Sequence, residues 1–435
     1  MRAVSQLDPS QLLDEARSLL GVLRRQARRA FVLELTGTPK AGKTTSVNVL
    51  ERFFSKAGFR VHVLKERAGE CPLLMKGHFF FNAWTTCSML AEVLERVETD
   101  VDLLILDRGF FDALVWLELQ LERGQVTDEE HKAFREFVLL ERWRRLVDLT
   151  VVTSVDPEIA VQRENLHLIV PREGSMMNKD ALLDFNGALE RAEKAYENEF
   201  NLLRFHSEAD VKQSNTELVH ELLPRIRRWA DPEILVLPRD LVDAAMGGAI
   251  GDHTAFLDVE AARDALARWA AAVRPMPRSE AEADGSVVQL VGCGVPTCEG
   301  SFFALRRSLK DEKVRQYGEY TLWKGCHIAG FGGSSSLEAP IAAQVAQRVR
   351  EDLYVAEKLE PTLLGLAWTP GEAHVGILFE VPVSPAVGRS MEQKEYRKQG
   401  RYETLSGKKR ARAELATLGL ERWSHAYLDH TKPPS

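Results

Sequence analysis

One short segment constrains the fold of this chain more than any other: Gly37-Thr38-Pro39-Lys40-Ala41-Gly42-Lys43-Thr44. It matches the pattern GxxxxGK[ST], in which a loop joins a strand to a helix. An apolar, β-rich run (31–37) precedes it, and a helix-compatible segment follows it. The backbone N–H groups of such a loop and of the helix N-terminus can bind a phosphate. The motif therefore predicts that this part of the chain binds a nucleoside triphosphate.

Each residue of the loop has an expected role. Lys43 would neutralise the β- and γ-phosphates of ATP, and the hydroxyl of Thr44 would bind Mg²⁺. The alternative reading is a glycine turn that arose by chance. We expect the ATP-binding residues to be the whole loop and the residue after it: Gly37, Thr38, Pro39, Lys40, Ala41, Gly42, Lys43, Thr44 and Thr45.

Strand-like and helix-like patterns alternate across the first half of the chain. The runs at 31–37, 60–66, 102–107 and 146–155 are rich in β-branched and apolar residues, and the segments between them have helical spacing. This alternation is typical of βαβ units. We therefore predict an α/β fold with a doubly wound parallel sheet and helices on both faces, reaching to about Trp229.

The rest of the chain is expected to form a different domain. PMPRSEAEADGS (275–286) has the proline, charge and small residues of a linker. Beyond it, strand-like runs such as VVQLVGCG and VGILFEVPVS flank one strong helix, IAAQVAQRVREDLYV. We predict four parts: an N-terminal helix (1–30), a P-loop domain (31–230), a helical connector and linker (231–286), and an α+β domain (287–435).

Composition narrows the function classes. The 435 residues carry 57 Lys+Arg against 64 Asp+Glu, a net charge of -7, which argues against a broad basic face for duplex nucleic acid. The chain contains no apolar run near the roughly 20 residues that cross a bilayer. The 5 cysteines are scattered, so a disulfide framework is not expected. We predict a cytoplasmic protein that binds no membrane; its oligomeric state stays open, a homodimer included.

Two expected strand ends carry charged candidates. Asp107 ends the run DLLILD, where a carboxylate can meet the Mg²⁺ shell, and Arg108 after it suits a phosphate contact. Glu66 follows the second strand, where it can orient or deprotonate an acceptor. The alternatives are a helix N-cap for Asp107, a surface arginine and a solvated glutamate. Further candidates for acceptor binding are Arg67, Phe81, Trp84 and Phe111, although such aromatic residues are commonly core.

Three segments resemble the thymidylate kinase family of nucleoside monophosphate kinases over about 31–229. LKERAGECP resembles its Arg-Glu-Pro-Gly-Gly segment, and LILDRGFFDAL its Asp-Arg-Tyr segment, with Gly109 in place of the aromatic residue. DPEIAVQRENLHLIVPREGSMMN resembles its lid, which implies that Arg163 and Arg172 close over the transferring phosphoryl group. Lys40 matches a basic loop residue of some members and would reach the γ-phosphate; solvent exposure is the alternative. Deoxynucleoside kinases share this architecture, so the acceptor is a monophosphate or a nucleoside.

A second resemblance, to the Nudix hydrolase core, covers about 287–428. The segment YTLWKGCHIAGFGGSSSLEAPIAAQVAQRVREDLYV is similar to its strand, glycine turn and catalytic helix, opening at Gly333. The weak metal candidates are Glu338, Glu351 and Asp352. Arg348 stands where the Nudix box has a metal-binding glutamate, and Tyr354 replaces its glycine. The resemblance therefore implies a degenerate Nudix-like domain that binds a nucleotide, regulates the kinase or mediates assembly.

Together these observations predict a Mg²⁺-dependent phosphoryl transfer from ATP to a nucleoside monophosphate, dTMP-like or modified. Lys43, Lys40, Glu66, Asp107, Arg108, Arg163 and Arg172 are its expected catalytic residues. Three alternatives stay open. The second domain could make the protein a bifunctional kinase and pyrophosphohydrolase, the chain could be a non-catalytic nucleotide sensor, or the loop could serve a P-loop ATPase.

Overall fold

A computed structural model describes most of the chain and divides it into two units, Met1–Ala230 and Asp231–Ser435. Each unit is described by itself. The described residues are 8–26, 29–73, 78–97, 99–167, 178–206, 211–247, 253–306, 319–330, 336–353, 355–393, 395–396, 405–415 and 417–431.

The first unit is built on a parallel sheet of five strands, in the order β2-β3-β1-β4-β5. Every neighbouring pair is parallel. The strands are β1 (Phe31–Gly37), β2 (Val61–Leu64), β3 (Leu103–Asp107), β4 (Leu149–Ser154) and β5 (Leu202–His206). β1 lies at the centre and is buried along its whole length. The prediction of a parallel α/β sheet is confirmed.

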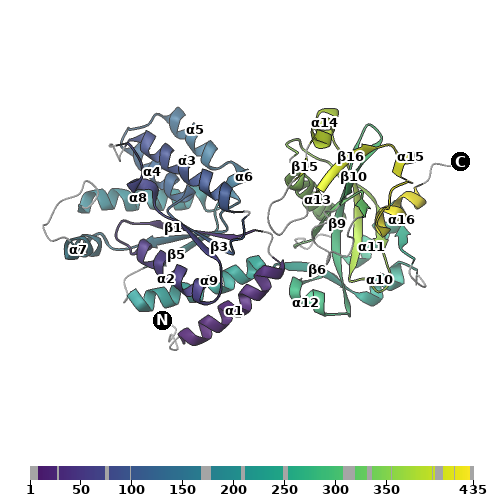
Figure 1. Ribbon diagram of the computed structural model, residues 1–435, viewed down its shortest axis with the longest axis horizontal. Coiled ribbons are helices and arrows are strands. Elements are labelled where there is room, and N and C mark those ends of the chain that lie inside the picture. Colours follow the sequence, from purple (N-terminus) through teal and green to yellow (C-terminus); the bar gives the residue numbers. More distant parts are fainter. Residues whose placement is uncertain are drawn as a thin grey trace. The chain divides into compact units, whose positions relative to one another are not determined.

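Helices cover both faces of this sheet (Figure 1). The side chains of α1, α2 and α9 share one core with Leu33 and Leu35 of β1. Those of α3, α4 and α8 share the other core with Val32. The helical bounds are α1 (Pro9–Gln26), α2 (Lys43–Lys56), η1 (Arg67–Gly69), α3 (Phe79–Arg96), α4 (Phe110–Glu122), α5 (Asp128–Val138), α6 (Glu141–Arg144), α7 (Pro157–His167), α8 (Lys179–Tyr196) and α9 (Val211–Ala230). The expected N-terminal helix is α1, which packs into this unit rather than standing apart.

The second unit is an α+β unit around a mixed sheet. Its main path runs β15-β16-β10-β9-β14-β13-β7, and β9 and β14 form its parallel pair. The strands are β6 (Glu233–Pro238), β7 (Ala255–Leu257), β8 (Arg274–Pro277), β9 (Val287–Cys298), β10 (Ser301–Arg306), β11 (Tyr320–Thr321), β12 (Lys324–His327), β13 (Thr362–Trp368), β14 (His374–Pro382), β15 (Glu395–Tyr396) and β16 (Leu405–Arg410). The helices are α10 (Arg239–Ala245), α11 (Val259–Trp269), α12 (Arg278–Ala283), α13 (Glu338–Asp352), α14 (Pro385–Gln393), α15 (Arg412–Leu415) and α16 (Arg422–His430).

The segment 231–286, expected as a helical connector and linker, belongs to this second sheet. β6 pairs with β8 and β9, and β7 pairs with β13. The expected linker at 275–286 forms the end of β8 and helix α12 instead. The reason is apolar packing between segments far apart in the chain: Ile234, Val236 and Met276 are buried together with Ala281 and Val287.

Helix α13 packs closely on β9 because that strand carries two glycines. A Cβ at Gly292 would lie 2.6 Å from Val345 Cγ2, and one at Gly294 would lie 2.6 Å from Val349 Cγ2. Real Cβ contacts are longer than this, so the absence of side chains at these two glycines allows the close approach of the helix.

Across the described part of the chain, no helix combines the length and apolarity that a membrane span needs.

Candidate functional site

The loop between β1 and α2 has the backbone of a phosphate cradle. Gly37 has a φ of 124°, and a Cβ there would lie 1.8 Å from the Thr153 carbonyl oxygen. Gly42, the N-cap of α2, has a φ of 90°, and Lys40 a φ of 60°. These left-handed residues turn the chain so that the N-terminus of α2 faces the loop. Such a helix terminus attracts anions.

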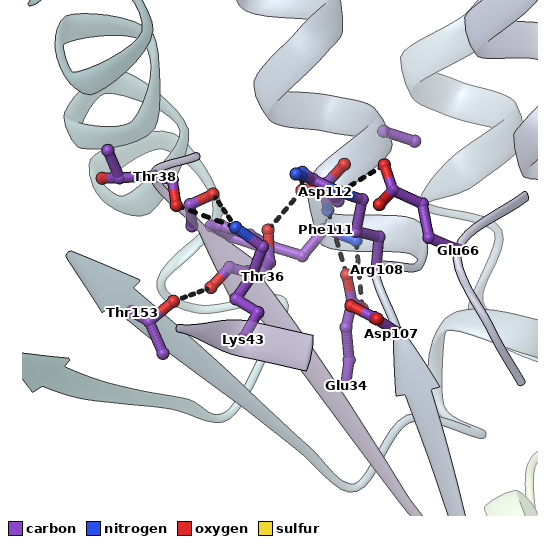
Figure 2. A network of polar contacts seen from close by, with 12 residues as sticks. Glu34, Thr36, Thr38, Lys43, Glu66, Asp107, Arg108, Phe111, Asp112 and Thr153 are labelled. Carbon is purple, nitrogen blue, oxygen red and sulfur yellow. Dashed lines mark hydrogen bonds and ion pairs between the residues drawn. The ribbon is translucent and has the colours of Figure 1, made fainter. Parts of the chain in front are cut away.

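Lys43 is folded back over this loop (Figure 2). Its Nζ donates to the carbonyl oxygens of Gly37 at 2.9 Å and Thr38 at 2.8 Å. Burial, helped by the nearby guanidinium of Arg108, lowers the pKa of Lys43 to about 7. The loop carbonyls thus hold the Lys43 ammonium beside the loop. From there it can donate to a phosphate in place of the carbonyls.

Asp107 and Thr44 meet beside the loop. Asp107 ends β3, next to β1, and its Oδ2 accepts a hydrogen bond from Thr44 Oγ1 at 3.1 Å. Among the described residues, nothing hydrogen-bonds to the buried Oδ1 of Asp107. Burial raises the pKa of Asp107, partly offset by the Thr44 bond. Hydroxyl and carboxylate oxygens are the ligands that hard divalent cations prefer. Thr44 and the unpartnered oxygen of Asp107 therefore fit such a cation. Thr45, one residue further along α2, is exposed.

Arg108 is held between carboxylates. It has a φ of 69°, a left-handed conformation that is costly for a residue with a side chain. Its Nε lies 2.8 Å from Glu66 Oε1, and its Nη1 lies 2.8 Å from Asp112 Oδ1 (Figure 2). Burial alone lowers its pKa, but Asp112, Glu66 and Asp107 together hold that pKa above its ordinary value. The guanidinium is therefore charged and fixed in place.

Two residues of β1 that no sequence motif contains also join this network. Thr36 Oγ1 donates to Asp112 Oδ1 at 2.7 Å. Glu34, fully buried, accepts from the backbone N–H of Phe111 at 3.2 Å and of Asp112 at 3.0 Å. Burial raises the pKa of Glu34 to about 8 against the lowering effect of those N–H groups. A signal existed: Glu34 and Thr36 alternate with leucines in an otherwise apolar strand.

The structure describes one of the two arginines predicted for the lid. Arg163, on α7, donates from Nη1 to the carbonyl oxygen of Lys40 at 3.2 Å. The Lys40 ammonium in turn pairs with Glu164, the next residue of α7. The other predicted lid arginine, Arg172, lies outside the described residues. One helix of the lid-like segment therefore reaches the phosphate loop.

The acceptor-binding candidates divide into two groups. Phe81 and Trp84 are half-buried on α3. The Phe111 prediction is wrong, because its side chain is 0% exposed and packs edge-on against Phe200 at 5.4 Å between ring centroids. A ring inside the core has no free face on which a base can stack. The guanidinium of Arg67 pairs with Glu70 and Glu92.

The carboxylates of α13 in the second unit are paired within the protein. Glu338 lies 3.2 Å from Arg263 Nε, and Glu351 accepts a hydrogen bond from Gln347. Asp352 is buried and lies 3.2 Å from Lys324 Nζ and 3.0 Å from Arg348 Nε. In the described ranges, no group of three His, Cys, Asp or Glu side chains is placed to hold a metal. Gly333 and Tyr354 fall outside the described residues.

The parallel sheet, the glycine-rich loop and the buried Lys43 define the first unit as a P-loop nucleotide-binding fold. A family model for the methylmalonyl-CoA mutase-associated GTPase MeaB matches residues 2–66. No curated protein matches the chain.

Solved structures give further similarities. A deoxyadenosine kinase from M. mycoides with bound dATP is 18% identical, covering 44% of this chain and 99% of its own, with a TM-score of 0.36. The same enzyme with dCTP gives 17% identity and a TM-score of 0.34, covering 44% and 98%. Tm1382, described as a Nudix hydrolase, is 15% identical and covers 46% and 97%, with a TM-score of 0.31. At these values the likeness carries no argument about function.

Proposed function

We propose that the first unit transfers the γ-phosphoryl group of ATP to a nucleoside or nucleoside monophosphate. One observation carries this proposal: the Glu66–Arg108 pair lies at the strand ends beside the phosphate loop, with 2.8 Å between its charged atoms. A phosphate loop alone serves many P-loop proteins. An ordered carboxylate and guanidinium next to it supply what a second, accepting substrate needs.

On the donor side, the loop backbone and the α2 N-terminus would hold the β-phosphate. Lys43 would leave the carbonyls of Gly37 and Thr38 and bind the β- and γ-phosphates. Thr44 and Asp107 would hold Mg²⁺, which the uncommitted Asp107 Oδ1 supports. When bound, that ion would offset charge on the phosphate oxygens.

Where the lid-like segment meets the phosphate loop, Arg163 and Lys40 would add positive charge over the γ-phosphate. Their contacts in this structure, to the Lys40 carbonyl and to Glu164, keep both side chains next to the loop. Arg172 would join them from the same lid segment. Fixed cations aimed at the transferring group stabilise the charge that spreads over its oxygens.

On the acceptor side, the charge balance favours a hydroxyl. Arg108 is already compensated by Glu66, Asp112 and Asp107. A dianionic monophosphate would have to displace Glu66 and would then lie close to the Asp112 carboxylate that also contacts Arg108. A nucleoside hydroxyl can instead donate its hydrogen bond to Glu66, which would then accept its proton. Of the two acceptor classes, the geometry therefore favours the nucleoside.

A nucleotide hydrolase without an acceptor is the second candidate, and the GTPase family match over residues 2–66 favours it. That match covers the phosphate loop but ends at Glu66, before Asp107, Arg108 and Asp112. For the second unit we propose nucleotide binding or regulation rather than hydrolysis. The pairing of Asp352 with Lys324 and Arg348 supports this choice.

The test is a nucleotide-consumption screen with Mg²⁺, using ATP and GTP as donors and all common nucleosides and monophosphates as acceptors. We expect one acceptor to be phosphorylated, and the activity to disappear in Lys43→Ala. GTP or ATP hydrolysis that needs no acceptor would support the hydrolase. Tight nucleotide binding without turnover on any acceptor would identify a sensor instead.

A further inference from the structure

A buried glutamate in the central strand touches the start of the helix that follows Arg108. Glu34 lies on β1, three residues before the phosphate loop, with no exposed surface. Its two carboxylate oxygens accept the backbone N–H groups of Phe111 and Asp112, in the first turn of α4. Those amides have no partner inside their own helix. Glu34 therefore caps α4 from a neighbouring strand (Figure 2).

Gly109, which directly precedes α4, is fitted to this carboxylate. A Cβ at Gly109 would lie 2.8 Å from Glu34 Cδ and 3.0 Å from Glu34 Oε2. The φ of Gly109 is −166°, an extended value that any residue adopts. The space beside Glu34 therefore requires glycine here. The Glu34 carboxylate occupies the room that a side chain at 109 would need.

The capped turn carries the residue that fixes Arg108. Asp112 accepts from Arg108 Nη1 and from Thr36 Oγ1 with the same oxygen, Oδ1. Arg108 itself is in a left-handed conformation, so its orientation depends on such external contacts. A shift at the first turn of α4 would move Asp112 and release one of the two carboxylates that hold the guanidinium.

We propose that Glu34 is a positioning residue for phosphoryl transfer, acting through the first turn of α4 and Asp112 on Arg108, with Gly109 as its steric complement. This inference rests on the proposed function for the role of Arg108 toward the acceptor. The capping itself is a property of the fold. It explains why this chain carries glycine directly after Asp107-Arg108, where a larger side chain would collide with Glu34.

The experiment uses the full-length chain with Glu34→Gln, Glu34→Ala, Gly109→Ala and the Glu34→Ala/Gly109→Ala double variant. Glu34→Gln keeps the volume but turns one amide N–H toward a backbone donor, so it tests the cap without a cavity. Gly21→Ala is the matched control, since its Cβ meets only ordinary contact at 3.7 Å.

Two readouts are measured. In Glu34→Gln we expect the amides of Phe111 and Asp112 to exchange with deuterium about tenfold faster. We expect the acceptor KM to rise about tenfold while the dissociation constant of ATP changes less than about twofold. In Gly109→Ala the same changes should appear. Added to Glu34→Ala, Gly109→Ala should have little further effect, because the clash has been removed.

Unchanged exchange and unchanged acceptor KM in Glu34→Gln would overturn the proposal. So would a Gly109→Ala effect of equal size in both backgrounds. If the wild-type chain phosphorylates no acceptor at all, the proposed function fails. The exchange data then still decide whether Glu34 and Gly109 position the start of α4.

Discussion

Two buried aspartates, Asp107 at the end of β3 and Asp352 at the end of α13, differ in the partners of their carboxylates. Beside β1 and α2, Asp107 keeps one buried oxygen without a hydrogen-bond partner among the described residues. On α13, Asp352 lies between Lys324 and Arg348. The first arrangement leaves one carboxylate oxygen available as a cation ligand, whereas the second carboxylate already lies beside two internal cations. Partners, rather than residue types, separate a candidate catalytic site from a structural ion pair.

The largest effect is expected at Lys43. Lys43→Ala should lower phosphoryl transfer about 10³-fold, because the ammonium is the main charge over the donor phosphates. Its counterpart in the second unit, Lys324→Ala, should leave the rate unchanged. Steady-state assays of both variants check this. Equal losses would mean that both regions serve the reaction.

Asp107→Asn should lower kcat about 10²-fold, because an amide is a poor ligand for Mg²⁺. The variant should also need more Mg²⁺ to reach half-maximal rate. A Mg²⁺ titration of wild type and variant measures this shift. An unchanged Mg²⁺ requirement would remove Asp107 from the proposed metal site.

Asp352→Asn should lower the free energy of unfolding of the second unit and leave phosphoryl transfer by the first unit unchanged. Removing its charge leaves Lys324 and Arg348 close together without their carboxylate, which we expect to cost about 3 kcal/mol. Calorimetry should show an earlier unfolding transition for the second unit, with kcat of the first unit unchanged. A loss of activity at constant stability would point to a catalytic role for α13.

Glu34→Gln should remove a pH dependence of stability from the first unit. Burial raises the pKa of Glu34 from 4.5 to about 8, so the folded state holds its proton more tightly than the unfolded state does. This contribution is fully present below pH 4.5 and is lost as the pH rises through 8. The melting temperature of the wild type should therefore fall relative to that of Glu34→Gln as the pH rises from 4.5 to about 8. If the melting temperatures of wild type and Glu34→Gln changed equally with pH, the raised pKa of Glu34 would be contradicted.

The smallest effect is expected at Glu351. Glu351→Gln should change neither kinase activity nor metal-dependent phosphate release, since this side chain already accepts a hydrogen bond from Gln347 on its own helix. Phosphate release that survives Lys43→Ala but disappears in Glu351→Gln would instead establish a second, hydrolytic site.

The candidate site was only partly predictable from sequence. The loop, Asp107, Arg108 and Glu66 could be found because each belongs to a local motif or ends a strand, and parallel strands end at the same edge of a sheet. The sequence marks Glu34 only as a polar residue in an apolar strand, and its contact with Asp112 joins residues 78 positions apart, so the role of Glu34 could not be predicted. Phe111 was misassigned because an aromatic residue near a motif has the same pattern whether it faces a ligand or a core.

The amino-acid sequence alone is enough to predict the parallel α/β unit and the position of its phosphate loop. Both follow from patterns within a few residues: strand and helix periodicity, and glycines where the backbone needs a left-handed turn. Only the folded chain shows that 231–286 joins the second sheet, that Asp352 has two cationic neighbours, and that Glu34 caps α4. These outcomes depend on side chains that meet only after folding, because burial and charge pairing are properties of the packed chain and not of its local pattern.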